Sequence, residues 1–277
     1  FRRRLLTASP DQRVFFNVET FTFYQLYQQL LLMAGKPQRS ISESARAGLI
    51  AVILRDLAAR GDLPIFAPIA HTPGLARILL EFIYELKQSL IDVEPFAAAA
   101  EKLAIPKAIE LARIYAAYQR LLISHDLVDR EGEGWLALST LAENDSLGTS
   151  IDLLVCDGYD QFNSMQARLL VQLSTRARET LTTLTTVPDR EETVGLRFKR
   201  ALDRLLACCG EENVYPDLHW ELFNTDALPR PGGEPLAALA ENLFHPAAKP
   251  ITVKTETVTR IEAPDPAVES AAVLRRV

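Results

Sequence analysis

The chain has 277 residues, of which 48% are hydrophobic and 24% charged, and its formal net charge is −6. This length suffices for one large domain or two ordinary ones with a sizeable core. The acidic balance argues against an electrostatic grip on nucleic acid over the whole chain, although it leaves room for a local basic patch. No apolar run approaches the ~18 residues of a membrane span, and Phe1–Leu6 is too short for a signal peptide.

The cysteines and histidines indicate neither a disulfide framework nor a metal site. Cys156 falls in a predicted strand, Cys208 and Cys209 are adjacent, and the four histidines are scattered without ligand spacing. A reducing cytoplasm is therefore the expected compartment. Because the chain starts at Phe1 and ends inside a predicted helix at Val277, we interpret it as a piece of a longer protein.

The first predicted elements are a strand over Val14–Val18 and a helix over Phe21–Met33, which Gly35 and Pro37 end. Residues 40–146 then indicate helices only. We expect one after a capping box formed by Ser40 and Glu43, and one after the Thr72 hydroxyl and Pro73. Two more are expected over Pro106–Ser124 and around Trp135, Leu138 and Leu141.

A βαβ unit follows. The apolar run Leu153–Cys156 is typical of a strand covered on both faces. Asn163 and Gln166 have the spacing of a capping box, which predicts that the next helix begins there. The β-branched run Thr180–Val187 is the second strand, and the length between the two predicts a parallel pair.

The last part of the chain mixes predicted helix, loop and strand. Leu196–Ala207 is amphipathic, and residues 210–248 are rich in loops with two short helical pieces, Leu218–Phe223 and Leu236–Phe244. Ile251–Ile261 is a strand candidate, and Asp265 with Pro266 starts a final helix. We expect an α/β fold, with a sheet domain formed by residues 1–39 and 147–277 and an all-helical insertion over residues 40–146.

The turn Asp157-Gly158-Tyr159-Asp160-Gln161 is the main candidate site, because ligands bind at the carboxyl ends of parallel strands. A carboxylate there could hold magnesium beside nucleotide phosphates, as in a Walker-B site. That chemistry needs a phosphate cradle, and no G-x-x-x-x-G-K-[ST] occurs in these residues. The alternative is an ordinary strand-end turn. We predict no catalytic residue and no metal ligand in this chain.

Two groups are candidates for DNA contact. Arg197, Arg200 and Arg204 have the spacing of one helix face that could touch phosphates, or could simply face solvent. Thr22 and Phe23 follow a predicted strand, where an aromatic ring could stack on an unpaired base. The alternative for Phe23 is packing in the core.

Four segments, in order along the chain, resemble a known family. Leu153–Phe162, followed by Gln166, Leu169, Leu170 and Leu173, resembles the DGF-x-x-F-x-x-x-Q-x-x-L-L-x-x-L segment of AddB/RexB-type proteins. These are the B subunits of bacterial ATP-dependent helicase–nucleases that process double-strand DNA ends. Thr22–Leu26 is similar to the T-F-x-x-L segment of superfamily-one helicases. Ile114–Leu121, with Asp126, is similar to a helix of the family's inserted domain. Ile261–Glu269 is similar to the family's A-x-(N/D)-P-x-x-E helix start.

The resemblance implies a P-loop-helicase-like parallel sheet with a large helical insertion. Active superfamily-one helicases have D-E-x-Q-D at the turn. Asp157 matches the first aspartate, Gly158 replaces the catalytic glutamate, and Asp160 and Gln161 stand in place of Gln-Asp. This degenerate motif implies that ATP is not hydrolysed here. The family's ATP with magnesium, iron–sulfur cluster and nuclease domain are expected outside this chain, which we expect to carry no cofactor.

The leading hypothesis is a region of a helicase–nuclease B subunit of double-strand break repair and recombination. It would guide single-stranded DNA or duplex ends beside an AddA-like helicase, without hydrolysing ATP itself. Two alternatives remain open: a scaffold that docks the helicase without touching DNA, and an active P-loop ATPase whose cradle precedes Phe1.

Overall fold

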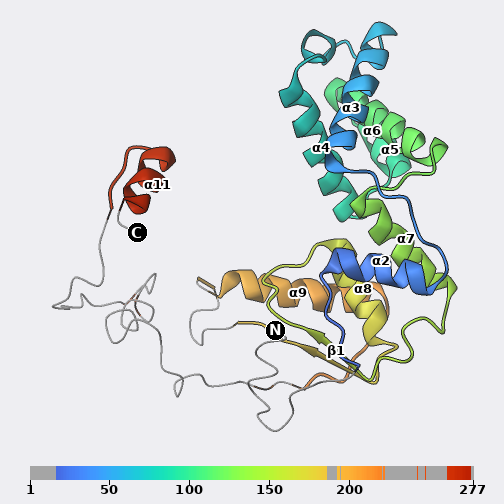
Figure 1. Cartoon of the computed structure of the whole chain (residues 1–277), viewed down its shortest axis with the longest axis vertical. Helices are drawn as coiled ribbons and strands as arrows, with labels where there is room; N and C mark the ends of the chain where they lie inside the picture. Colours follow the sequence, from blue (N-terminus) through green and yellow to red (C-terminus); the bar gives the residue numbers. More distant parts are fainter. Residues whose placement is uncertain are drawn as a thin grey trace. The chain divides into compact units, whose positions relative to one another are not determined.

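A computed structural model describes residues 17–185, 192–193, 195–219, 221, 242, 247 and 261–275 (Figure 1). The chain forms two compact units, residues 1–184 with 201–215, and residues 185–200 with 216–277. The described elements are α2 (Phe23–Met33), α3 (Glu43–Ala59), η1 (Ala67–Ile69), α4 (Pro73–Gln88), α5 (Val93–Lys102), α6 (Pro106–Ser124), α7 (Arg130–Glu143), β1 (Leu153–Cys156), α8 (Ser164–Ser174), β2 (Glu179–Thr182), α9 (Leu196–Glu211) and α11 (Pro266–Leu274).

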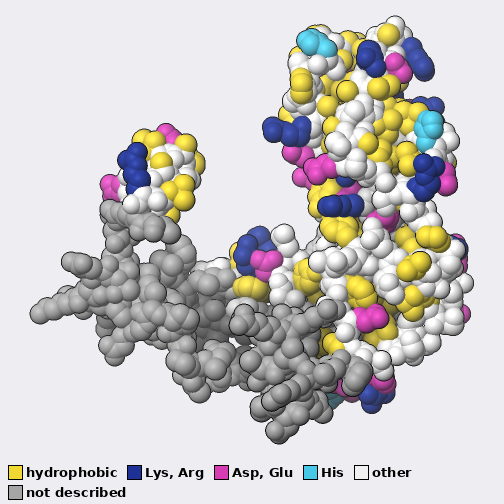
Figure 2. Space-filling model, in the orientation of Figure 1, with side chains coloured by type: hydrophobic (Ala, Val, Ile, Leu, Met, Phe, Trp, Pro, Cys, Tyr) yellow, Lys and Arg dark blue, Asp and Glu magenta, His cyan; other side chains and the backbone are white. Residues whose placement is uncertain are grey.

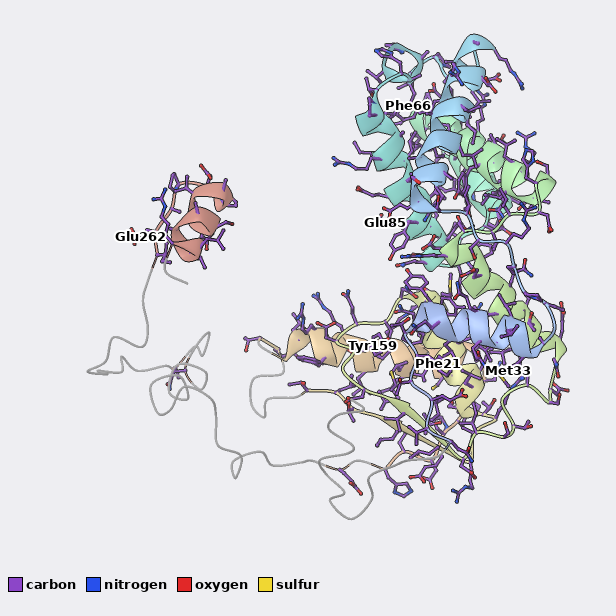
Figure 3. The ribbon with its side chains drawn as sticks, viewed as in Figure 1. Phe21, Met33, Phe66, Glu85, Tyr159 and Glu262 are labelled. Carbon is purple, nitrogen blue, oxygen red and sulfur yellow. The ribbon has the colours of Figure 1, made fainter. Side chains whose placement is uncertain are left out.

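Helices α3 to α6 form a helical block in the first unit (Figure 1). Apolar residues three and four positions apart on α3, α4 and α6 face each other and share one hydrophobic cluster. Its fully buried members include Ile50, Leu54, Leu79, Ile83 and Ile114. At the loop before η1, where Phe66 lies buried (Figure 3), the carboxylate of Glu110 accepts hydrogen bonds from two backbone amides. This carboxylate satisfies donors that the turn leaves unpaired.

The chain enters and leaves the helical block through two neighbouring segments, residues 39–41 and 127–129. Ser40 and Val128 form an isolated parallel bridge. The amide of Ile41 donates to the Val128 carbonyl at 2.9 Å, and the Val128 amide donates to the Arg39 carbonyl at 3.0 Å. We call this pair of segments the neck. Such a close pair is what an insertion into a continuous domain requires. The predicted insertion over residues 40–146 remains our proposal, although it includes α7, which packs against α2.

The rest of the first unit is a base built from α2, α7, α8, β1, β2 and the part of α9 from Ala201. Strands β1 and β2 are parallel, with Leu153 opposite Glu179 and Cys156 opposite Thr182, and α8 is the crossover between them. The expected parallel βαβ unit is thus confirmed. A second hydrophobic cluster joins α2, α7 and α8, and its members include Tyr27, Leu141 and Leu169.

Several local expectations differ from the structure. Ser40 does not cap α3: the N-cap is Ser42, which accepts from the Ala45 amide at 3.3 Å, while the Ser40 hydroxyl donates to Glu133. Thr72 is the N-cap residue of α4, but its hydroxyl donates back to the Ile69 carbonyl instead of capping. In both places the hydroxyl donates a hydrogen bond to an acceptor outside the helix and does not cap it.

The strand β1 is less buried than its sequence predicts. Leu153 is 51% exposed and Val155 38%, and only Cys156 is buried. In β2, which lies beside β1, Leu181 is 46% exposed. The expectation that both faces are covered is therefore wrong for the described residues, since α8 and its neighbours pack against one face of this pair.

The second unit contributes helix α11 and the first residues of α9. The expected cap of α11 is confirmed: the Asp265 carboxylate accepts from the amides of Ala267 and Val268, each at 2.9 Å. Most residues of the predicted strands Val14–Val18 and Ile251–Ile261, and of the short helical pieces between residues 218 and 244, lie outside the described residues.

Candidate functional site

The candidate turn begins where β1 ends, and its aspartate ties the two strands together. The Thr183 amide donates to the Cys156 carbonyl at 2.9 Å, and the Thr183 hydroxyl donates to Oδ1 of Asp157. Asp157 is otherwise exposed. Part of its hydrogen-bonding capacity thus fixes the end of β2, which is a structural use of a strand-end carboxylate.

Gly158 has a backbone conformation that other residues adopt only at a cost. Its φ is +79°, and a β-carbon built there would meet nothing within 4 Å. The space is open, so the constraint lies in the backbone, where glycine avoids a cost of roughly 1–2 kcal/mol that other residues have in the left-handed region. Gly158, which the sequence resemblance predicts to replace the helicase glutamate, is thus a residue that suits the turn.

Beyond Gly158, the chain enters an aromatic cluster formed by Phe23, Tyr159 and Phe162, beside the start of α2. Tyr159 is labelled in Figure 3. The Phe23 ring packs edge-on against Tyr159, with ring centroids 4.9 Å apart, and against Phe162, with centroids 6.3 Å apart. The rings of Tyr159 and Phe162 are stacked, with centroids 5.8 Å apart. Edge-to-face and offset pairs of this kind are favourable. This cluster attaches the turn to α2.

Helices α2 and α8 both begin at this cluster, each with a reciprocal capping box. Thr22 accepts from the Gln25 amide at 3.4 Å, and the Gln25 side chain accepts from the Thr22 amide at 2.8 Å. The Asn163 side chain accepts from the Gln166 amide at 2.8 Å, and the Gln166 side chain accepts from the Asn163 amide at 3.2 Å, as the sequence predicts. The partial positive charge of two helix N-termini is therefore placed near the turn.

The structure places the two candidate residues of α2 differently. Thr22 is exposed, but its hydroxyl and amide serve the cap. Phe23 is only 7% exposed, which fits the packing interpretation, and its contact with DNA remains a prediction. Phe21, which we did not single out, is 41% exposed just before the cap (Figure 3). An aromatic residue directly before a T-x-x-Q cap is the signal that could have identified it.

The three arginines of α9 also differ. Arg197 and Arg200 belong to the second unit and are exposed, and Figure 2 shows Lys and Arg side chains gathered beside α9. Arg204 belongs to the first unit, where it donates to the Ser164 hydroxyl at the start of α8 and lies 3.9 Å from Glu211. The charge of Arg204 is therefore engaged within the protein. Arg197 and Arg200 are candidates because they are exposed.

The described residues contain no group of three or more His, Cys, Asp or Glu that could hold a metal ion. Cys156, next to the turn, is a buried free cysteine. Burial, and to a lesser degree the Asp157 charge, raises the pKa of its thiol to about 11. The thiol is therefore protonated at neutral pH and a poor nucleophile or metal ligand.

Sequence reasoning missed a second polar site at the neck. Lys87 and Asp129 form a fully buried ion pair, with Nζ and Oδ1 separated by 2.5 Å. Arg46 donates to the hydroxyl of Tyr118, which in turn donates to Asp129. The signal was a charge within an apolar stripe, since Lys87 comes four residues after the core residue Ile83.

Comparison with protein families matches the N-terminal family of ADDB over residues 2–217, more than half of the chain. The chain belongs to the AddB N-terminal family. The resemblance found in the three segments between Thr22 and Leu173 is thereby confirmed, whereas the fourth, Ile261–Glu269, lies outside the matched residues. Comparison with curated proteins gave no match.

AddB is a subunit of a DNA-repair helicase–nuclease and works with AddA and DNA. The described part of this AddB chain shows the corresponding mixture of helices with a parallel strand pair. Among the described residues, no helix is both long and apolar enough to span a membrane.

Proposed function

We propose that this AddB region is a helicase-like scaffold that guides single-stranded DNA and does not hydrolyse ATP itself. The observation that carries the proposal is Gly158, a residue at φ +79° in the turn where helicases keep a glutamate. Asp157 alone matches the helicase motif, and it bonds to Thr183. With glycine directly after Asp157, the turn lacks the glutamate that would orient an attacking water in the helicase motif.

The proposed DNA path begins at the N-terminus of α2. Single strands bind where an aromatic ring can stack on a base and cations can contact the backbone. Phe21 supplies an exposed ring, and the adjacent capped helix end supplies a positive potential. Arg197 and Arg200, which belong to the second unit, are exposed cations and are proposed as a separate contact with DNA. Because the net charge of the chain is −6, such binding must be local.

ATP turnover tests the first half of the proposal. We expect no magnesium-dependent hydrolysis by the chain, with or without DNA. Gly158→Glu, which restores the helicase residue, should not create activity, because the substituted residue is strained at its φ. The proposal fails if the chain hydrolyses ATP and Asp157→Ala abolishes that hydrolysis, an outcome that would favour the P-loop ATPase alternative.

Fluorescence anisotropy with a labelled single strand, at several salt concentrations, tests the second half. Phe21→Ala should weaken binding by about 1–3 kcal/mol, the usual value of one stacked base. Arg197→Ala with Arg200→Ala should lower the salt slope by roughly 0.7 for each phosphate that is no longer neutralised. Arg77→Ala on α4, where the side chain is 78% exposed, is the matched control and should change nothing. Salt-independent or undetectable binding would refute the guiding role.

The exposed strand residues favour one second function, docking of AddA without DNA contact. Leu153, Val155 and Leu181 present apolar side chains on neighbouring strands. If this scaffold function is the correct one, Leu153→Lys should reduce co-purification with AddA while Phe21→Ala leaves it intact. The same two variants thus separate the two functions.

A further inference from the structure

A group of buried charged side chains surrounds the neck. Five charged side chains there are at most 9% exposed: Arg46, Lys87, Asp129, Glu131 and Glu133. The helical block supplies both cations, one from α3 and one from α4, whereas the start of α7 in the base supplies all three carboxylates. The contact between block and base at this point is therefore an ionic one, built from opposite charges on its two sides.

Two of the three carboxylates are well satisfied. Asp129 accepts from Lys87 at 2.5 Å, from the Gly132 amide at 2.8 Å and from the Tyr118 hydroxyl at 2.9 Å. Glu133 accepts from the Gln28 amide group at 3.2 and 3.3 Å and from the Ser40 hydroxyl. Donors from both sides of the neck thus offset the cost of burying these two groups.

Glu131 differs from both. It is 1% exposed, and neither of its carboxylate oxygens accepts a hydrogen bond from another described residue. Its nearest cation is Arg46, whose Nη2 lies 3.4 Å from Oε2, but Nε of the same guanidinium is engaged by Tyr118 at 3.1 Å. A buried carboxylate with so little compensation is costly when ionised and much less costly when protonated.

The charge balance of the cluster also favours a protonated Glu131. With every group ionised, two cations would face three carboxylates in a buried space. The other titratable side chains that act on Glu131 are phenols of α2, Tyr24 and Tyr27, and burial raises the pKa of both. They remain neutral and add no compensating charge. One proton would bring the cluster to neutrality.

We propose that Glu131 binds this proton and that the neck is a proton-linked latch between the helical block and the base. With Glu131 neutral, the two cations of the block equal in number the two remaining carboxylates, Asp129 and Glu133, and the neck is closed. Loss of the proton leaves an unmatched buried charge, which is relieved when the neck opens and water reaches the carboxylate.

The expected pH dependence has a definite sign. Burial raises the pKa of Glu131 above its ordinary 4.5, against the opposing charge of Arg46. A raised pKa in the folded state means that the stabilising contribution is fully present below the unfolded pKa and is lost as pH rises through the folded value. Within that window the unfolding constant attributable to this group approaches a tenfold increase per pH unit.

Carbon-13 NMR of the unsubstituted chain, labelled at its glutamate carboxyl carbons, tests proton binding directly. The Glu131 resonance should titrate at a pH above 4.5, whereas that of Glu143, which is 65% exposed at the other end of α7, serves as the reference. Because this measurement needs no substitution, it does not depend on a variant that folds. A Glu131 titration no higher than that of Glu143 would overturn the proposal.

Hydrogen exchange tests the latch. The amides of Ile41 and Val128 bridge the neck. Their protection factors, corrected for the intrinsic rate, should fall as pH rises in the unsubstituted chain and stay constant in Glu131→Gln, which keeps the side chain neutral. Glu143→Gln should behave like the unsubstituted chain. If Glu131→Gln leaves the pH dependence of these two amides unchanged, the neck is not the element that the proton controls.

Discussion

The ammonium of Lys87 lies 2.5 Å from Oδ1 of Asp129, and these side chains are 2% and 0% exposed. Lys87 comes from the last turn of α4, and Asp129 is the N-cap of α7. Burial opposes the ionisation of Asp129, but the charge and hydrogen bond of Lys87, the Gly132 amide and the Arg46 charge together outweigh it and hold the pKa of this carboxyl below its usual range. This pair is therefore one of the contacts that join the helical block to the base.

Removing either partner of this pair should destabilise the protein strongly. Lys87→Met or Asp129→Asn should cost about 3–5 kcal/mol in the free energy of unfolding by urea, because each leaves a buried charge unmatched. The double variant should cost less than the sum of the two. The exposed pair Lys36–Glu143 is the control, and breaking it should cost less than about 1 kcal/mol. Equal losses for the two pairs would contradict this account.

Gly134 permits the close approach of α7 to its neighbours. A β-carbon at this position would lie 1.9 Å from the sulfur of Met165 and 3.1 Å from the ring of Tyr27. Gly134→Ala should therefore cost about 1–3 kcal/mol of stability, and adding Met165→Ala should recover part of the loss from the clash.

Gly48, in the middle of α3, provides the opposite expectation. A β-carbon there would meet nothing within 4 Å. Gly48→Ala should stabilise the protein by about 0.5–1 kcal/mol, because alanine is the better helix former. Chemical denaturation of Gly134→Ala and Gly48→Ala under the same conditions distinguishes a packing requirement for glycine from a general preference for alanine in helices. Destabilisation by Gly48→Ala would show that the difference is not one of packing.

Arg176 closes the C-terminal end of α7. Its guanidinium donates to the carbonyls of Leu141, Asn144 and Leu147, the last two at 2.6 and 2.8 Å. Arg176→Ala should cost about 2–3 kcal/mol, since hydrogen bonds to a charged donor contribute more than neutral ones. Arg176→Lys should rescue it only partly, because an ammonium lacks the planar fork. Arg178→Ala, at a 75% exposed site, is the control, and thermal unfolding is the measurement.

Thr22 allows the capping role to be separated from the proposed DNA contact. Thr22→Ala should lower stability by about 1 kcal/mol, because the cap is removed. Thr22→Asp keeps an acceptor at the helix N-terminus and should retain stability, but its charge should weaken single-strand binding if DNA passes there. Asn163→Asp, the same kind of change at the cap of α8, controls for added charge. Unchanged DNA affinity in Thr22→Asp would exclude Thr22 from the DNA path.

The sequence predicts best those features that depend on local spacing. Asn163 and Gln166 mark the start of α8 because a capping box is a four-residue pattern. Asp265 marks α11 for the same reason. Helix α5 lies in the stretch predicted to be helical but was not predicted as a separate helix. Pro95 lies in its first turn, where a proline removes an amide that has no helical partner anyway.

The buried charges of the neck depend on contacts between distant segments. Lys87 continues the stripe of Leu79 and Ile83, so its burial could have been anticipated. Its partner could not, because Asp129 is 42 residues away and reads locally as a helix cap. Likewise, the four apolar residues of β1 do not reveal that two of them are exposed, since the covering layers are set by the rest of the fold.

The position of α2 has a consequence for synthesis of the chain. Gln28 bonds to Glu133, which is 105 residues later, and α2 shares its hydrophobic cluster with α7 and α8. At a translation rate of about 5–20 residues per second, Glu133 is synthesised roughly 5–20 s after Gln28. The helical block, whose contacts are more local, can fold during that interval. Tyr27, Leu30 and Leu31 stay uncovered until then, so the ribosome-bound chain offers an apolar helix to chaperones before the base exists.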